Sequence, residues 1–409
     1  MMNVLLAAAL QDAPLKEAVE AELPALLEHY RWFHQNPELS SKEEKTAARF
    51  AAELRAAGWT VTERIGGTGV VGALRNGAGP AVLARIDMDA LPIKEETGLP
   101  YASVNGAMHA CGHDVHLSAG IGLARALSKT KAHWSGTVFL IGQPAEETGV
   151  GAKAMLEDPL FAKAVDVAPV ACLSIHDTPA FQAGTVSLCA GFSSANADSV
   201  DIKIFGKGGH GAWPHQTVDP IVMAAEMILA FQTIVARKVD PTSPAVVTVG
   251  SIHGGSKHNI IPDEVTLQLT LRSYDDAVRE KLIAEVKHIA KSTSETHHAV
   301  KPPEVVVHPD GFPAVYHDPK LVDRLRPLFG KLFGEVHVKP AFPAMGAEDF
   351  GRFGKHWKVP GLQIGIGGAP GPGKSPGLHS NKWAPDPEPT VRTATLALSR
   401  AVIDFLPKR

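Results

Sequence analysis

Cysteine is scarce in this chain, since 409 residues contain only Cys111, Cys172 and Cys189. A small and odd number of cysteines in a long chain argues against a framework of disulfide bonds. A cysteine that serves a function is then expected to act as a metal ligand or as a nucleophile.

The sequence also lacks a basic block and a long apolar run. Its formal net charge is −3, so we expect no nucleic-acid partner. The N-terminal run MMNVLLAAAL is too short to span a bilayer, and we expect no membrane partner. The run is either the remnant of a secretion signal, although it lacks the usual basic residues, or a frayed terminus. The compartment stays open, with the cytoplasm slightly favoured over a periplasmic or secreted location.

The length suggests more than one domain, and no internal repeat is present. Apolar strand-like runs alternate with helical stretches up to about residue 190, which indicates an α/β layer with helices over a mixed sheet. From about 198 to 294 the predicted order is strand, helix, two strands and helix, typical of an antiparallel sheet with two helices on one face. The sequence therefore predicts an α/β domain over 1–194 and 304–409, with an inserted α+β (ferredoxin-like) domain over 195–303.

Three local predictions concern helix and loop boundaries. Ser40 or Ser41 is placed to cap a helix that runs to about Ala57, and Glu43 or Glu44 would complete a capping box. Pro24 is expected to kink a helix over 12–34. The Gly- and Pro-rich segment 367–377 is typical of a flexible loop.

The densest group of reactive side chains is MHACGHDVH, residues 108–116. Cys111 and His113, two residues apart on a turn, can face the same metal ion, and thiolate and imidazole are good ligands for zinc-like ions. The alternative is a helix N-terminus with exposed histidines and a buried Cys111. The motif alone does not decide between the two.

Acidic residues and histidines follow several apolar strands. Glu146 and Glu147 come after TVFLI, Asp87 and Asp89 after AVLARI, and His176 after ACLSI. One carboxylate of an adjacent pair can bind metal while the other acts as a base, although a solvated loop would give the same pattern. Because ligand crevices in α/β sheets lie outside the carboxyl ends of the strands, we expect these side chains to converge.

A family resemblance now becomes visible. The chain contains DMDALP, HACGHD, QPAEE, GKGGHGAWPH, NIIPDE, MGAEDF and LHS. Together these motifs resemble the aminoacylase/carboxypeptidase-type dinuclear metallohydrolases, in the branch of hippurate hydrolase and the auxin-conjugate amidohydrolases. The similarity extends from RWFHQNPELS (31–40) to LHSNKWAPDPE (378–388). It implies a metal-dependent amidohydrolase that cuts the amide bond of N-acyl amino acids or similar small conjugates.

The resemblance also implies a set of metal ligands and the ions they bind. The residues that match the ligands are Cys111, His113, Glu147, His176 and His379. Cys111 would lie between two divalent ions, with zinc or manganese expected first and nickel or cobalt as alternatives.

Further roles follow from the same resemblance. Glu146 matches the general base. Asp89 matches the Asp of an H-x-D motif whose His is replaced here by Asp87, so both aspartates are expected to orient ligands rather than to bind metal.

The inserted segment resembles a lid or dimerisation domain. His210 matches a residue that reaches across a dimer to stabilise the oxyanion in the partner's site. Asn259 and Arg272 match residues that hold the substrate, Arg272 through a carboxylate. The alternative for Arg272 is an exposed arginine at a strand end. The implied partners are a small N-acyl amino acid and a second copy of the chain, in a homodimer or dimer-based oligomer.

Rival functions remain open at this point. A dipeptidase or carboxypeptidase on short peptides would use the same residues. A thiol hydrolase with Cys111 as nucleophile would leave the glutamate pair unexplained. A non-catalytic metabolite-binding module would have no use for Glu146. The acyl group is not readable from the sequence.

Overall fold

The computed structural model describes residues 2–371 and 375–408. The chain forms two compact units. The larger unit comprises Met1–Ser193, Tyr316–Pro343 and Asp349–Arg409, and the inserted unit comprises Ser194–Val315 and Ala344–Glu348.

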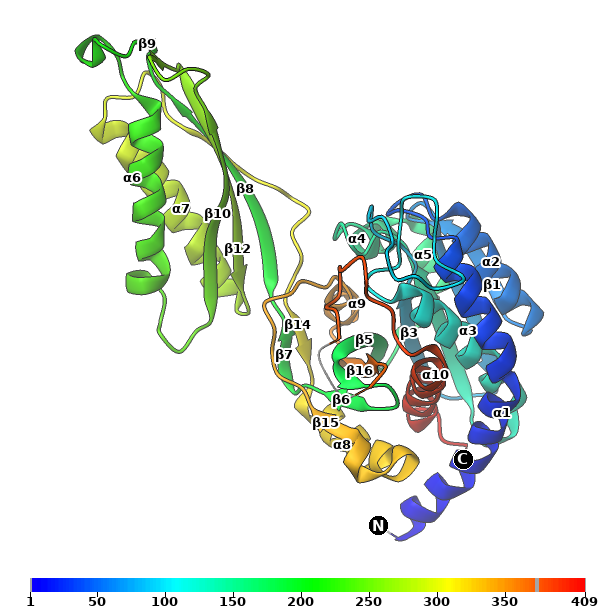
Figure 1. Ribbon diagram of the computed structural model, residues 1–409. Coiled ribbons are helices and arrows are strands. Elements are labelled where there is room, and N and C mark those ends of the chain that lie inside the picture. The colour runs from blue at the N-terminus through cyan, green and yellow to red at the C-terminus, as the bar shows by residue number, and fades with distance from the viewer. Residues whose placement is uncertain (1, 372–374, 409) are drawn as a thin grey trace. The chain divides into compact units, whose positions relative to one another are not determined.

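The larger unit is built on a mixed sheet of eight strands (Figure 1). The central strands β4, β3, β5 and β16 run parallel in that order, while β2 and β6 pair antiparallel to them. The sheet order is β1 (Thr60–Ile65), β2 (Gly69–Asn76), β4 (Gly136–Gln143), β3 (Ala81–Asp87), β5 (Cys172–Gln182), β16 (Gly361–Ala369), β6 (Val186–Leu188) and β15 (Val338–Pro340).

Helices cover this sheet and bury its apolar strands. The helices α1, α3 and α10 pack on one another, and α3 and α10 also contact the central strands (Figure 1). Leu26, Ile121 and Val402, one from each helix, are fully buried there. The helices of the unit are α1 (Met2–Gln35), α2 (Glu44–Ala56), α3 (His113–Lys129), α4 (Gly151–Glu157), α5 (Pro159–Ala164), α8 (Pro319–Phe333), α9 (Gly351–Trp357) and α10 (Pro387–Asp404), with 3₁₀ turns at Lys131–His133 and Glu335–His337.

The inserted unit has the ferredoxin-like order of strands and helices, β-α-β-β-α-β. Its antiparallel sheet has the order β10, β12, β8, β13, and α6 and α7 lie side by side on one face (Figure 1). The elements are β8 (Asn196–Phe205), β9 (Gly209–His210), α6 (Pro220–Thr233), β10 (Ala245–Gly254), β11 (Ile260–Ile261), β12 (Glu264–Ser273), α7 (Asp276–Thr296) and β13 (Glu304–Val307), with short helical turns at Pro214–Gln216 and Ile234–Lys238. A separate two-stranded sheet joins β7 (Gly191–Ser194) and β14 (Val315–His317).

The fold class predicted from the sequence, α/β with an inserted α+β unit, is therefore confirmed. One strand differs in its place: β13, expected to belong to the larger domain after residue 303, pairs with β8 of the inserted unit. Alternating apolar residues predict that EVVV is a strand, but they do not tell which sheet edge accepts it.

One helical stretch, Pro220–Lys238, is long and apolar enough to cross a membrane, with a mean hydropathy of 1.4. The core helix of a soluble protein meets the same criterion. Here Met223, Met227 and Phe231 are fully buried in the core of the inserted unit.

Several local predictions differ from the structure. The helix α1 begins at Met2 and not near residue 12, and α2 begins at Glu44 without a side-chain cap. Pro24 lies inside α1, and the predicted kink there stays a prediction. The first residues of the predicted loop, Gly367–Ala369, form the end of β16, and 372–374 lie outside the described residues.

Candidate metal centre

The turn that begins α3 brings two candidate ligands to the sheet edge. Gly112 has φ 80° between Cys111 and His113, a left-handed conformation that suits glycine. A Cβ at Gly112 would lie 2.0 Å from Oδ1 of Asp177, so only glycine allows this close approach to β5. The sulfur of Cys111 thereby lies 3.5 Å from Nε2 of His176.

Both buried histidines are oriented by backbone carbonyls. His113 donates from Nδ1 to the carbonyl oxygen of Asp89 at 2.8 Å, and His176 donates from Nδ1 to that of Asp177 at 2.7 Å. A carbonyl can only accept, so each neutral ring carries its proton on Nδ1 and presents a lone pair on Nε2. Such bonds orient metal-binding histidines in proteins.

The remaining candidate ligands approach from two other segments. Nε2 of His379 lies 3.4 Å from Oε2 of Glu147. The backbone N–H of His379 donates to the carbonyl of Ala110 at 2.8 Å, which ties this residue to the α3 turn. His379 has φ 63°, a conformation seldom adopted outside glycine.

These side chains form overlapping groups in which the donor atoms lie within 4.8 Å of one another. Cys111 belongs both to the group with His113 and His176 and to the group with Glu147 and His379. The structure thus brings together all five predicted ligands, from four separate stretches of chain.

The chemistry of these donors fits divalent cations. Burial raises the pKa of the Cys111 thiol well above its usual range, and it also raises the pKa of Glu147. A bound metal displaces the proton from a ligand, so it would offset the effect of burial on both groups. Nε2 of His113 and Oε1 of Glu147 are buried and have no hydrogen-bond partner among the described residues. Buried polar atoms of this kind are expected where an ion binds.

The two aspartates lie behind the candidate ligands. Asp87 is fully buried and accepts from Nη1 of Arg85 at 2.6 Å and from Nδ1 of His116. Burial alone would raise its pKa, but the Arg85 guanidinium and the hydrogen bond from His116 hold the pKa of Asp87 well below its usual range. Asp89 accepts the backbone N–H of Glu147 at 3.1 Å. Both arrangements agree with orienting roles.

Sequence reasoning gave His116 no role, although it lies one helical turn from His113. Its Nδ1 bonds Asp87 and its Nε2 accepts the backbone N–H of Asp177 at 3.0 Å. Since both ring nitrogens have partners, His116 is a support of the site rather than a free ligand. The spacing of three residues on one helix was the signal that could have found it.

The strand that carries His176 is longer than predicted. β5 continues to Gln182, so His176 lies within the strand and not after it. Its pairing with β3 ends at Ser174, however, and from there β5 pairs with β16 alone. His176 therefore lies two residues past the last β5 residue that pairs with β3, where β5 has a neighbouring strand on one side only.

Of the residues predicted in the inserted unit, two lie together. The backbone carbonyl oxygen of Asn259 accepts the N–H of Gly211 at 2.9 Å, and Ile260 pairs with His210. His210 is exposed, and its Nδ1 accepts from Ala212 N–H at 3.1 Å, which leaves the proton on Nε2.

Arg272 lies elsewhere in the inserted unit. Arg272 is half-buried and pairs with Ala197 at one end of β12. The other end of β12, near His210, is at Glu264, which pairs with Phe205 and lies eight residues from Arg272. At 3.3 Å per residue the two ends are about 26 Å apart. The unit therefore does not bring Arg272 together with His210 and Asn259.

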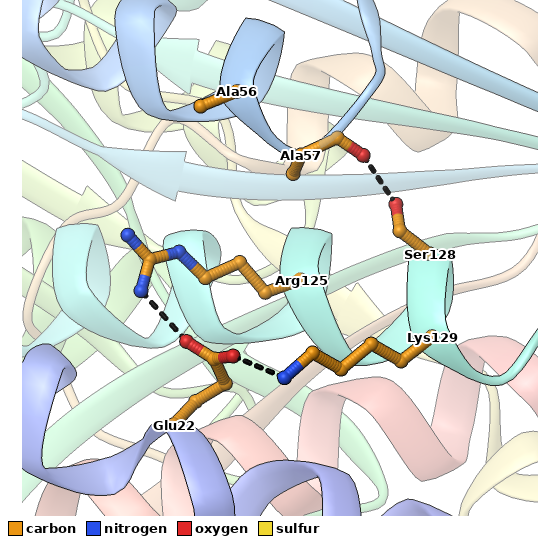
Figure 2. A pocket seen from close by; sticks show the side chains of 6 residues that line it. All are labelled: Glu22, Ala56, Ala57, Arg125, Ser128 and Lys129. Carbon is orange, nitrogen blue, oxygen red and sulfur yellow. Dashed lines mark hydrogen bonds and ion pairs between the residues drawn. The ribbon is translucent and has the colours of Figure 1, made fainter.

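A surface depression elsewhere contains none of these residues. Figure 2 shows Glu22 of α1 accepting hydrogen bonds from Arg125 and Lys129 of α3 beside Ser128 and the end of α2. These ion pairs join helices at the surface and form no part of the candidate centre.

Comparison with known proteins identifies the family. The sequence profile described as peptidase family M20/M25/M40 matches residues 83–402. The chain belongs to this family. The fold agrees: the YxeP protein of Bacillus subtilis, a dinuclear metal-binding peptidase of the M20 family, superposes with a TM-score of 0.78 at 28% identity, over 94% of this chain and 99% of the other.

Curated relatives in the M20 family act on amide bonds. The chain is 36% identical to thermostable carboxypeptidase 2 of Saccharolobus solfataricus, over 96% of this chain and 98% of the relative. It is 38% identical to the hippurate hydrolase of Campylobacter jejuni (78% and 82% covered) and to the N-acetyl-L-cysteine deacetylase of Bacillus subtilis (81% and 77%). This M20 protein is a metal-dependent hydrolase of amide bonds.

Replacing Gly112 by alanine should destabilise the fold and lower metal content. The left-handed φ costs a side chain about 1–2 kcal/mol, and the clash with Asp177 adds about 1–3 kcal/mol. Gly106→Ala is the matched control, because Gly106 has φ 87° but open space around its Cβ position. Thermal unfolding and elemental analysis would measure both variants. Equal losses of stability would show that the contact with Asp177 does not constrain the turn.

Proposed function

We propose that this protein hydrolyses the amide bond of N-acyl amino acids with two divalent metal ions. The candidate ligands would be Cys111, His113, Glu147, His176 and His379. The observation that carries the proposal is that one sulfur, Cys111, belongs to two overlapping groups of metal-type donors within 4.8 Å. A ligand shared in this way is the one expected to bridge two ions.

The metal pair, when bound, would lower the pKa of water toward neutrality and polarise the scissile carbonyl. Zinc or manganese fits the thiolate, imidazole and carboxylate donors first, with nickel and cobalt as alternatives.

Glu146 would act as the general base. It is buried beside Glu147, and it belongs with His113 and Glu147 to one of the groups within 4.8 Å. Its carboxylate would take a proton from the attacking water and pass it to the leaving amine, since amines leave only when protonated.

The substrate class rests on what the relatives share. Hippurate and N-acetyl-L-cysteine are both N-acyl amino acids, and these substrates belong to the hippurate hydrolase and the deacetylase. The second candidate is a carboxypeptidase, favoured by the similarity to thermostable carboxypeptidase 2 over 96% of this chain. Both classes of substrate carry a free carboxylate, which the half-buried Arg272 would bind with two parallel hydrogen bonds.

A substrate screen would separate these candidates. Metal-free protein reloaded in turn with zinc, manganese, nickel or cobalt would be assayed with benzoyl, acetyl and indoleacetyl amino acids and with dipeptides. Faster turnover of acyl amino acids is the expected result. A preference for peptides under every metal would replace the first candidate by the second.

The inserted unit supports a homodimer. The helix α6 exposes Ile221, Val222 and Leu229, the last at 72%, and β10 is an edge strand of the sheet. Apolar side chains beside an open sheet edge are typical of a surface that pairs with another copy. Since Arg272 lies about 26 Å along β12 from Glu264, at the opposite end of the strand from His210, the two side chains cannot hold one small substrate in the same subunit. His210 and Asn259 would therefore act in the partner's site, with His210 donating from Nε2 to the oxyanion.

Complementation between inactive subunits tests this role. His210→Ala should lower kcat about 100- to 1,000-fold, as expected for loss of one oxyanion donor. Mixing His210→Ala with Glu146→Gln under subunit exchange should restore roughly a quarter of wild-type activity, because half of the dimers would then hold one intact site. No recovery after exchange, with mixed dimers verified by mass, would place His210 in its own subunit's site or outside catalysis.

A further inference from the structure

The segment Glu38–Glu43 has no role in the mechanism above, yet it supplies a buried carboxylate. Glu43 is fully buried. Its Oε1 accepts the backbone N–H groups of Ser41 at 2.8 Å and Ala145 at 2.9 Å, and its Oε2 accepts from the Thr68 hydroxyl at 2.6 Å. Helix capping does not explain this residue, because Glu43 precedes α2 without a side-chain cap bond. A buried carboxylate is costly, so a structural demand at Ala145 is the expected reason for it.

Ala145 is the residue that sets the direction of the glutamate pair. It has φ 49°, in the left-handed region that costs energy for any residue with a side chain. It follows β4 and directly precedes Glu146. The turn is closed by the N–H of Gly151, which donates to the Ala145 carbonyl at 3.2 Å. The bond from Ala145 N–H to Glu43 favours this strained conformation.

The amide on the other side of Glu146 is held in a similar way. Oδ2 of Asp89 accepts the N–H of Glu147 at 3.1 Å and the hydroxyl of Ser40 at 2.6 Å. The segment is fixed beside Asp89 by the N–H of Ala90, which donates to the Glu38 carbonyl at 2.8 Å. Carboxylates thus accept the N–H groups of the residues before and after Glu146. Glu43 of the segment binds Ala145, and Asp89, which is bonded to the segment through Ser40, binds Glu147.

We propose that Glu38–Glu43 is a clamp that positions Glu146 and Glu147, and that Glu43 is its main positioning residue. Glu43 acts by holding Ala145 in the left-handed conformation, and Ser40 acts by holding Asp89. The proposal rests on the proposed function in so far as Glu146 is the base and Glu147 a ligand.

Glu43→Ala should lower kcat about 10- to 100-fold, since small displacements of catalytic groups have effects of this size. KM should change little, because no substrate contact is assigned to Glu43. Glu43→Gln should keep most of the activity, since an amide oxygen can accept both N–H groups and the amide nitrogen can donate to Thr68. Thr68→Val is the matched control: it removes the bond at Oε2 but leaves the Ala145 end intact. Equal losses of kcat in Thr68→Val and Glu43→Ala would overturn the proposal.

A second substitution tests whether Glu43 acts through Ala145. Glycine adopts the left-handed conformation without strain. The double variant Glu43→Ala/Ala145→Gly should therefore have a kcat at least about 3-fold higher than that of Glu43→Ala alone. A purely structural Glu43 would give no recovery, and that result would contradict the proposal. If Glu43→Ala does not fold, Ser40→Ala tests the other half of the clamp. It should lower kcat about 10-fold at unchanged KM, by loss of one orienting bond, and unchanged kcat would contradict the clamp.

A crystal structure of Glu43→Ala separates this proposal from the assignment of the base. Ala145 should leave the left-handed region, with Glu146 and Glu147 displaced. An unchanged φ at Ala145 would overturn the clamp whatever the activity. Wild-type turnover in Glu146→Gln would instead overturn the proposed base and leave the crystallographic test intact.

Discussion

Replacing Glu146 by glutamine is expected to abolish measurable turnover while metal content stays near wild type. Glutamine keeps the size of the side chain but cannot take a proton from water. Positioned general bases contribute about 100- to 10,000-fold to rate, so a fall of this size in kcat is expected. Steady-state kinetics and elemental analysis of the same preparation would measure both quantities.

The matched control for this variant is Glu157→Gln, an exposed glutamate at the end of α4. It carries the same chemical change away from the candidate centre and should leave kcat unchanged. Unchanged turnover in Glu146→Gln would remove Glu146 as the proposed base. Loss of metal together with turnover would instead make Glu146 a ligand.

Replacing Cys111 by serine should sharply lower metal content. Loss of an outer-sphere partner alone weakens metal affinity about 10- to 100-fold, so loss of a ligand shared by two ions should weaken it at least about 100-fold. Cys189→Ser is the matched control, because Cys189 is a buried cysteine outside the cluster whose sulfur contacts the Phe192 carbonyl at 3.4 Å. A serine hydroxyl can keep that bond. Full metal occupancy in Cys111→Ser would refute the bridging role.

The same residue separates a metal enzyme from a thiol hydrolase. Nucleophilic cysteines have a lowered pKa, whereas burial raises the pKa of Cys111. A thiol enzyme would be inactivated by alkylation with metals bound and would ignore chelators. The account here expects the reverse: chelation removes activity, and bound metal protects Cys111 from alkylation.

Much of the candidate centre could be proposed from the sequence because its residue types are rare in combination. Cys111 and His113 on one turn, and acidic residues after apolar strands, point to metal chemistry before any fold is known. What the sequence could not give is how these stretches meet. The approach of Gly112 to Asp177 and the support of His116 by Asp87 depend on contacts between distant segments.

The predicted capping box shows where local reasoning was wrong. Ser40 and Glu43 fit the pattern, and a cap stabilises a helix by about 0.5–2 kcal/mol. The Ala145 amide, buried at the site, would cost about 1–3 kcal/mol without a partner. Glu43 therefore bonds Ala145, and Ser40 bonds Asp89. The tertiary demand outweighs the local preference.

Anomalous diffraction from crystals of the metal-loaded protein tests the central assignment most directly. The assignment predicts two metal peaks, both within bonding distance of the Cys111 sulfur, about 2.3 Å for zinc. His113, Glu147, His176 and His379 would complete their coordination. A single peak, or two peaks that both lack Cys111 as a ligand, would contradict the shared thiolate and with it the two-metal centre proposed for this chain.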